Sequence, residues 1–349
     1  MRYQVVLLLS LLSICCSCRR SVYRPSSATL PEITTCWSDE PESRYRLKNS
    51  HLEPYIFEVY DQDYLHAHQL PAHVPMRNNV TQTLDTAPLI ADLQDAVYHL
   101  LTVNKKTKKL DNFVILKQTD YNYFKHTGLI VLKHKKHPFV IKLFMESPEN
   151  FVKPFTRGIE ECAFFVMGGG MNRYLAGFTR IANRNEIDKR IQSNRYWRNV
   201  LDTPRKWFWC PHDSRTIDIV GKHIGDQPQH VRLPAMYAII CDEIRSDHGF
   251  SLLSKRDRRM TVAISQFVGI GVDPHINNFM IEKGTNKIVI IDTEHFPTLI
   301  GIKDDFQIND FITYYSGLFF RFMRKKLTYD KKSRLELQTR PKKPLFCYI

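Results

Sequence analysis

Residues 271–294 read GVDPHINNFMIEKGTNKIVIIDTE, a polar loop that is followed by two short apolar runs. Pro274 prevents a continuous helix through the loop, so Asp273 and Asn278 are expected on an irregular segment. The second apolar run predicts a strand that ends at Asp292. Three oxygen-bearing side chains can therefore converge. Two of them suit Mg²⁺, which takes few protein oxygens, and the third remains free to orient a nucleophile in phosphoryl transfer.

Upstream, three apolar runs predict an antiparallel meander of strands: 113–116, 128–132 and 139–144. In the third run the side chains alternate between two faces, so Lys142 shares a face with Val140 and Phe144. A lysine on such an apolar strand needs a partner, and the next helical run begins with Glu160 and Glu161, either of which can pair with it. The alternative is a lysine that extends from an edge strand into solvent.

Further apolar patterns surround the opening stretch. The run 234–244 predicts a buried strand that passes into a polar connector, and the spacing within 260–268 predicts a helix that leads into the polar loop. After the stretch, Asn309 or Asp310 is expected to cap a helix with an aromatic stripe, which core packing explains. The fold class predicted from these patterns is α+β.

The order of these features resembles the protein-kinase-like fold. The residues DPHINN at 273–278 are similar to the catalytic loop of the aminoglycoside phosphotransferase and choline kinase branch, which has a histidine two places and an asparagine five places after its catalytic aspartate. The residues IDTE at 291–294 resemble the Asp-x-Glu metal motif of that branch. By this resemblance the chain would be a divergent member of that branch. The resemblance implies two lobes: an antiparallel-sheet N-lobe and a mainly helical C-lobe.

The resemblance also implies a role for each matching residue. Asp273 would orient or deprotonate an acceptor hydroxyl, and His275 would support the loop through hydrogen bonds. Lys142 would contact the phosphates of ATP, with Glu160 or Glu161 fixing its position. The implied ligands of Mg²⁺ are Asn278, Asp292 and Glu294. The expected activity is ATP- and Mg²⁺-dependent transfer of the γ-phosphate to a hydroxyl acceptor, which is a small molecule, a lipid or a protein.

The N-terminal stretch motivates an alternative function. Arg2 precedes an apolar run that ends in a cysteine-rich segment, so residues 1–20 are expected to be a signal peptide or a lipoprotein signal. The chain would then be exported, anchored in a membrane or secreted as an effector. Because ATP is scarce outside the cytoplasm, the alternative is a catalytically inactive, pseudokinase-like binding module of the cell envelope or a secreted effector.

Composition divides the remainder of the chain. The proline-rich residues 21–110 are expected to form a linker and an irregular N-terminal extension with one helix at 87–103. Residues 111–323 form the expected kinase-like domain, with the N-lobe ending near 245 and the C-lobe beginning near 246.

The formal net charge of +14 implies affinity for anions, and the basic tail 324–349 is expected to be solvated or to contact an anionic membrane surface. No interleaved aromatics or known motif in the tail supports binding to nucleic acid.

Overall fold

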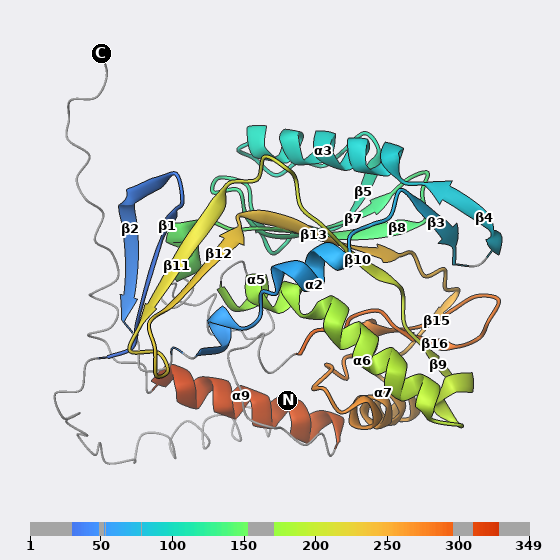
Figure 1. Cartoon of the computed structure of the whole chain (residues 1–349). Coiled ribbons are helices and arrows are strands. Elements are labelled where there is room, and N and C mark those ends of the chain that lie inside the picture. Colours follow the sequence, from blue (N-terminus) through green and yellow to red (C-terminus); the bar gives the residue numbers. More distant parts are fainter. Residues whose placement is uncertain are drawn as a thin grey trace, which may run out of the picture. The chain divides into compact units, whose positions relative to one another are not determined.

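Figure 1 shows the computed structural model, which describes residues 30–48, 52, 54–77, 79–152, 171–295 and 310–327. The helices and strands given below belong to one unit, Pro31–Ile349. Three of the predictions fall outside the described residues: the signal at 1–20, the helix with Glu160 and Glu161, and the tail beyond residue 327. None of the described helices has both the length and the apolar composition that a membrane crossing requires.

A central antiparallel sheet holds the three predicted strands. Its members are β5 (Phe113–Lys117), β6 (Tyr121–Asn122), β7 (Thr127–His134), β8 (Phe139–Met145), β10 (Lys206–Trp209) and β13 (Met236–Asp242). The order across the sheet is β10-β13-β8-β7-β5, and β6 pairs with β7. The predicted meander is confirmed, because β5, β7 and β8 cover the three apolar runs and pair antiparallel in sequence order.

Helices pack on both faces of this sheet. The described α-helices are α2 (Gln62–Ala67), α3 (Ala87–Thr102), α4 (Pro148–Val152), α5 (Met171–Phe178), α6 (Arg180–Ser193), α7 (Lys255–Val268) and α9 (Phe311–Leu327). Figure 1 shows α3 along one face of the sheet. There, Ile141 and Leu143 of β8 belong to the same buried cluster as Leu93 of α3. On the other face, Phe144 packs in a cluster with Phe178 of α5. The predicted alternation along β8 is therefore confirmed, and it turns Lys142 toward the side of α5 and α6.

Three smaller sheets complete the described fold. Their remaining strands are β1 (Glu32–Trp37), β2 (Glu40–Lys48), β3 (His73–Met76), β4 (Asn79–Asp85), β9 (Leu201–Asp202), β11 (Thr216–Lys222), β12 (Gln229–Pro234), β14 (His248–Gly249), β15 (Phe279–Ile281) and β16 (Ile288–Ile290). The sheet orders are β12-β11-β1-β2, β14-β15-β16-β9 and β3-β4. The described architecture is thus α+β with mainly antiparallel sheets.

The N-terminal region differs from its prediction. Residues 21–110 were expected to be a linker and an irregular extension, yet the described part contains β1, β2, the β3-β4 hairpin, α2 and α3. The helix at 87–103 is confirmed as α3. The sequence did not predict these strands. One reason is that β1 pairs with β11, which lies far away in the sequence: Thr35 lies opposite Ile219 of β11. A six-residue strand that pairs with such a distant strand shows only a short alternation of apolar and polar residues in its own sequence, which is a weak signal for prediction.

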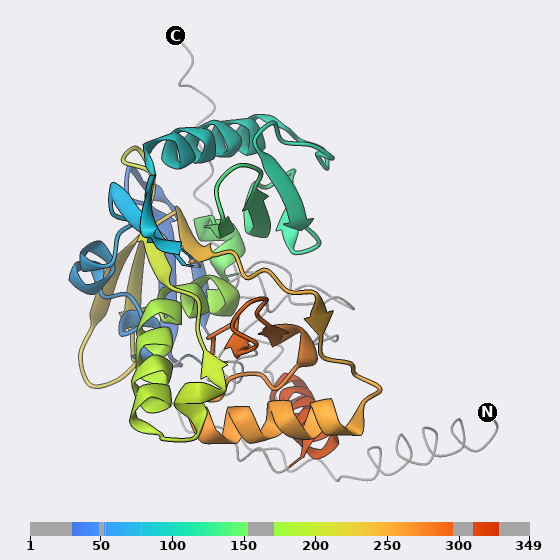
Figure 2. The same ribbon diagram turned by 90° about the vertical axis from the view of Figure 1, so that its right-hand side faces the viewer.

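The loop of the opening stretch is held between α7 and the sheet of β15 and β16. Ser254 caps the start of α7 by accepting from the backbone N–H of Asp257 at 3.2 Å. Gly269 ends the helix with φ of 64°, and Gly271 has the same positive φ, so the chain turns sharply into the loop. Figure 2 shows α7 beside α6, and apolar side chains of both helices share one buried cluster with β15 and β16.

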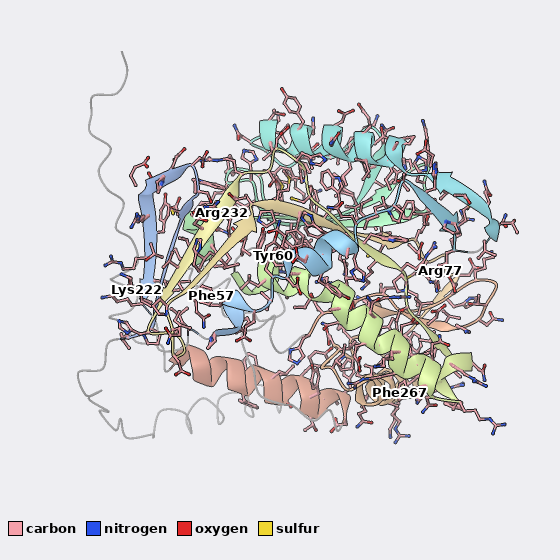
Figure 3. The ribbon with its side chains drawn as sticks, in the orientation of Figure 1. Phe57, Tyr60, Arg77, Lys222, Arg232 and Phe267 are labelled. Atoms are coloured by element: carbon pink, nitrogen blue, oxygen red, sulfur yellow. The ribbon has the colours of Figure 1, made fainter. Side chains whose placement is uncertain are left out.

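A cluster of ion pairs connects the β3-β4 hairpin to two sheets. Arg77, labelled in Figure 3, donates from Nε to Glu282 Oε1 at 2.6 Å and from Nη2 to Asp202 Oδ2 at 2.8 Å. Nearby, Arg205 donates to both carboxylate oxygens of Asp242 on β13. We call these five residues the Arg77 cluster.

Candidate active site

The loop after α7 folds on its own polar side chains. The backbone N–H of His275 donates to Asp273 Oδ1 at 3.1 Å, and the side-chain amide of Asn278 donates to the carbonyl oxygen of Asp273 at 3.1 Å. The backbone carbonyl of Asn278 accepts from Ile291 N–H at 2.9 Å, which ties the loop to the end of β16. Strand β16 thus returns the chain to the loop, where the charges of Asp292 and Glu294 act on Asp273.

Asp273 is the group on this loop whose acidity is most altered. Burial raises the pKa of Asp273 to about 7, even though hydrogen bonds from the Tyr315 hydroxyl and the His275 N–H oppose the shift. Both of these bonds reach Oδ1, and within the described part of the chain no donor to Oδ2 is recorded. Tyr315 comes from α9, which begins where Asp310 accepts from two backbone N–H groups as predicted. Asp273 thus keeps one oxygen for a proton near neutral pH.

His275 contributes to the shape of the loop. Its ring Nδ1 accepts from the backbone N–H of Asn277 at 3.3 Å, which caps the short 3-10 helix Ile276–Asn278. Burial lowers the pKa of His275 below its ordinary value, so the neutral ring that this bond requires is favoured. The supporting role that the resemblance implies for His275 is compatible with this contact.

Lys142 meets Asp292 across a separation of 150 residues. Its Nζ donates to Asp292 Oδ2 at 2.8 Å, and the two side chains remain 15% and 16% exposed. The lysine of the apolar strand therefore has an acidic partner, as expected. The described partner is Asp292, whereas the predicted partners Glu160 and Glu161 lie outside the described residues.

A buried arginine holds both carboxylates of the Asp-x-Glu motif. Arg180, the first residue of α6, donates from Nη1 to Asp292 Oδ1 and from Nη2 to Glu294 Oε2. Its side chain is only 2% exposed. Burial alone would raise the pKa of Asp292, but the charges of Arg180 and Lys142 outweigh burial and hold that pKa well below its usual range. We call Lys142, Arg180, Asp292 and Glu294 the Arg180 cluster.

This arrangement does not fit Mg²⁺ on the predicted ligands. Mg²⁺ requires free oxygen donors in near-octahedral geometry. A guanidinium already bridges the two carboxylates, and its positive charge would repel a cation placed beside it. Among the described residues, no group of three or more His, Cys, Asp or Glu side chains is arranged to hold a metal ion.

A buried lysine on β10, Lys206, holds the Asp-x-Glu motif by hydrogen bonds. Lys206 Nζ donates to the Ile291 carbonyl at 3.2 Å and to Thr293 Oγ1 at 2.7 Å. Thr293 Oγ1 in turn donates to the Arg180 carbonyl at 2.7 Å. Burial lowers the pKa of Lys206 to about 7, and the charges of Lys142 and Arg180 act in the same direction. The motif is thus fixed to β10 and to the start of α6.

Another buried arginine lies at the loop between β5 and β7. Arg173 of α5 donates from Nη1 to Asp120 Oδ2 at 2.6 Å, and Lys117 Nζ lies 2.8 Å from the same oxygen. Burial lowers the pKa of Arg173, and the charges of Glu294 and Asp292 act on it from a greater distance. Four basic side chains therefore lie in or near the Arg180 cluster: Lys142, Arg173, Arg180 and Lys206.

Sequence reasoning found some of these residues and missed others. Lys142, Asp273, Asn278, Asp292 and Glu294 belong to the site that the structure brings together. Those that the sequence missed are Arg173, Arg180, Lys206, Thr293 and Tyr315. Tyr315 was assigned to an aromatic stripe that packs in the core. The sequence did not single out Arg173 and Arg180, because they lie in α5 and α6, a helical stretch of mixed polarity that contains several other basic residues.

Comparison of the chain with protein-family models, curated proteins and solved structures found no match.

Proposed function

We propose that this protein is a nucleotide-dependent phosphotransferase with a divergent, two-lobed kinase-like fold. The observation that carries the proposal is the bond between Lys142 Nζ and Asp292 Oδ2 at 2.8 Å, formed beside the loop of Asp273 and Asn278. In protein kinases a strand lysine and a metal-motif aspartate both act on the phosphates, and an aspartate of the catalytic loop accepts the substrate proton. These three elements come together here from separate parts of the chain.

The order of the strands supports the kinase-like fold. In protein kinases the phosphate-binding lysine lies on the third strand of the sheet. Leaving aside the two-residue β6, Lys142 lies on the third strand of the central sheet in chain order, β8. Strand β13 passes into the connector before α7, and α7 leads into the Asp273 loop. The central sheet would be the N-lobe, and α7, β15, β16 and α9 would belong to the C-lobe.

The chemistry follows from the charges of the site. The acceptor hydroxyl oxygen attacks the γ-phosphorus, the bond from that phosphorus to its bridging oxygen breaks, and the nucleoside diphosphate leaves. Asp273 Oδ2 takes the hydroxyl proton, for which a pKa of about 7 is suitable at neutral pH. Lys142 and the neighbouring cations neutralise charge on the transferred phosphoryl group. We propose ATP as the nucleotide.

Transfer of label from ATP labelled on the γ-phosphate, either to an added acceptor or to water, tests the proposal. The full chain is incubated with ATP alone and with hydroxyl acceptors, in the presence of Mg²⁺ and in excess EDTA. Asp273→Asn keeps the size of the side chain and removes the base, so turnover is expected to fall at least about 100-fold while ATP affinity is retained. Equal turnover by Asp273→Asn and the parent chain would remove Asp273 from the proposed role.

A second candidate is a nucleotide-binding module without catalysis. The observation that favours it is the occupation of acidic groups by the chain itself: Arg180 binds Asp292 and Glu294, and Tyr315 binds Asp273. Thermal unfolding with increasing ATP separates the two candidates, because a ligand that binds the native state raises its melting temperature. Saturable stabilisation without label release favours the binding module.

A further inference from the structure

We propose that Arg180 takes the place of a divalent metal in this site, so that the protein binds a metal-free nucleoside triphosphate. The inference deepens the proposed function and rests on it. The Asp-x-Glu motif that predicts a magnesium site instead holds a guanidinium between its two carboxylates.

The contacts leave no carboxylate of the motif without a cation. Asp292 receives Arg180 on Oδ1 and Lys142 on Oδ2, while Glu294 receives Arg180 on Oε2. Two cations thus balance two anions within the Arg180 cluster. A planar guanidinium suits this task because its donors form a fixed fork and its charge persists at every physiological pH.

The position of Arg180 is fixed by more than these ion pairs. The Arg180 carbonyl accepts from Thr293 Oγ1, and Asn183 donates to the Thr293 carbonyl at 2.9 Å, so the first turn of α6 is bound to the motif itself. The guanidinium carbon also lies 5.6 Å from the centre of the Phe144 ring. The arginine is therefore held by the backbone, by an aromatic ring and by two carboxylates.

Replacing the guanidinium with Mg²⁺ is costly for physical reasons. With a side chain that is 2% exposed, Arg180 would lose both carboxylates to the metal and remain buried with an unpaired charge. Moving it into solvent would require α6 to separate from the motif, which the bonds of Thr293 and Asn183 oppose. The cluster therefore excludes the metal from the predicted ligands by occupation and by repulsion.

The same cluster can accept phosphates from the side that remains open. Lys142 and Asp292 are its partly exposed pair, at 15% and 16%. Arg173 and Lys206 stand behind it, and the only carboxylate recorded as an ion-pair partner of either among the described residues is Asp120, on Arg173. Lys142 on the open side is expected to bind the phosphates, and Lys206 adds positive charge at pH values below about 7, where it is protonated.

Isothermal titration of the full chain with ATP provides the test, in excess EDTA and in excess MgCl₂. Binding in excess EDTA is expected to be at least as tight as in MgCl₂, because the metal adds no contact with the protein and removes negative charge from the triphosphate. An affinity at least about tenfold higher with MgCl₂ overturns the inference and leaves the proposed function intact. Absence of ATP binding in both buffers removes the proposed function, and this inference with it.

Substitutions in α6 test whether Arg180 is the residue responsible for metal-independent ATP binding. Arg180→Met frees both carboxylates, so ATP binding in EDTA is expected to weaken at least about tenfold and MgCl₂ to restore it. The matched control is Arg184→Met, one helical turn later, where the guanidinium lies 3.9 Å from Asp188 and 19% of the side chain is exposed. The control is expected to behave as the parent chain in both buffers. A variant that stays insensitive to MgCl₂ would contradict the assignment.

Direct metal binding gives a readout that needs no nucleotide. Electron paramagnetic resonance of added Mn²⁺ is expected to show a stoichiometric bound ion in Arg180→Met and none in the parent chain. Stoichiometric Mn²⁺ in the parent chain that Glu294→Gln abolishes overturns the inference. Should Arg180→Met fail to fold, as judged by near-ultraviolet circular dichroism, the EDTA comparison on the parent chain decides the matter without it.

Discussion

The Arg77 cluster and the Arg180 cluster share a design but differ in their surroundings. In each, an arginine bridges two carboxylates from other segments of the chain, with the Arg77 side chain 13% exposed and the Arg180 side chain 2% exposed. In the Arg77 cluster three carboxylates face two arginines, so acid is in excess. Around the Arg180 cluster, Arg173 is paired with Asp120, and Lys206, which has no recorded carboxylate partner among the described residues, adds a positive charge below a pH of about 7. Only the second region can attract a phosphate, and only it adjoins the Asp273 loop.

The comparison shows that an arginine between two carboxylates does not by itself mark a functional site. Around Arg77, Glu282 is 1% exposed and the contacts join a hairpin to two sheets, which is a structural task. Around Arg180, Lys142 and Asp292 keep part of their surface open to a ligand. The charge balance and the neighbouring Asp273 loop distinguish the two roles, whereas exposure does not, because Asp202 and Arg205 of the Arg77 cluster are each 30% exposed.

The largest expected effect that separates the regions is on stability. Arg77→Met leaves Glu282 buried without its ion pair, so the free energy of unfolding is expected to fall by about 3–5 kcal/mol. Arg180→Met is expected to cost less, because Asp292 keeps Lys142 and because Glu294, at 12%, is more exposed than Glu282 at 1%. Urea unfolding of both variants at neutral pH measures the difference. Equal losses would mean that the two clusters have the same structural role.

A smaller effect is expected on ligand affinity. Lys142→Met removes a cation from the open side of the site, so ATP affinity is expected to fall about tenfold, or about 1.4 kcal/mol. The control is Lys133→Met on β7, whose Nζ lies 2.6 Å from Glu243 Oε1 in another ion pair. Titration calorimetry of both variants and of Arg77→Met makes the comparison. A similar loss in the Arg77 variant would place the ligand elsewhere.

The third comparison concerns pH and separates the Asp273 loop from both clusters. Since the pKa of Asp273 is raised to about 7, the carboxylate that accepts a proton forms only as pH passes that value. Turnover is expected to rise about tenfold per pH unit below 7 and to level off above it.

Stability is expected to change in the opposite direction. The native state holds the proton between the ordinary pKa of 3.8 and about 7, so this contribution is lost as pH rises through that interval. In Asp273→Asn both dependences are expected to disappear. A stability profile that the substitution leaves unchanged would contradict the assignment of the raised pKa to Asp273.

The sequence anticipated elements whose signals are local. The alternating apolar strand identified β8 and the face that Lys142 occupies, and the apolar run before Asp292 identified β16. The capping aspartate located the start of α9. Each of these features depends on neighbours within a few residues, where periodicity and capping act directly.

The strands of the N-terminal region and the arginines of the site were not anticipated. β1 is completed by β11, and Arg180 meets carboxylates 112 and 114 residues away. Neither of these long-range contacts is indicated by the residues that flank it in the sequence. The lowered pKa of Lys206 is likewise a consequence of burial that depends on the whole fold.

The sequence by itself determined the polar loop from Asp273 to Asn278, the aspartate that follows the next strands and the lysine on an apolar strand. Only the tertiary structure decided what these groups bind, because opposite charges brought together in a low-dielectric interior select their partners by proximity. Arg180 is the outcome of that selection. A motif whose residues suit a metal ion is occupied by a cation of the chain itself, since α6 delivers a guanidinium to the space between Asp292 and Glu294.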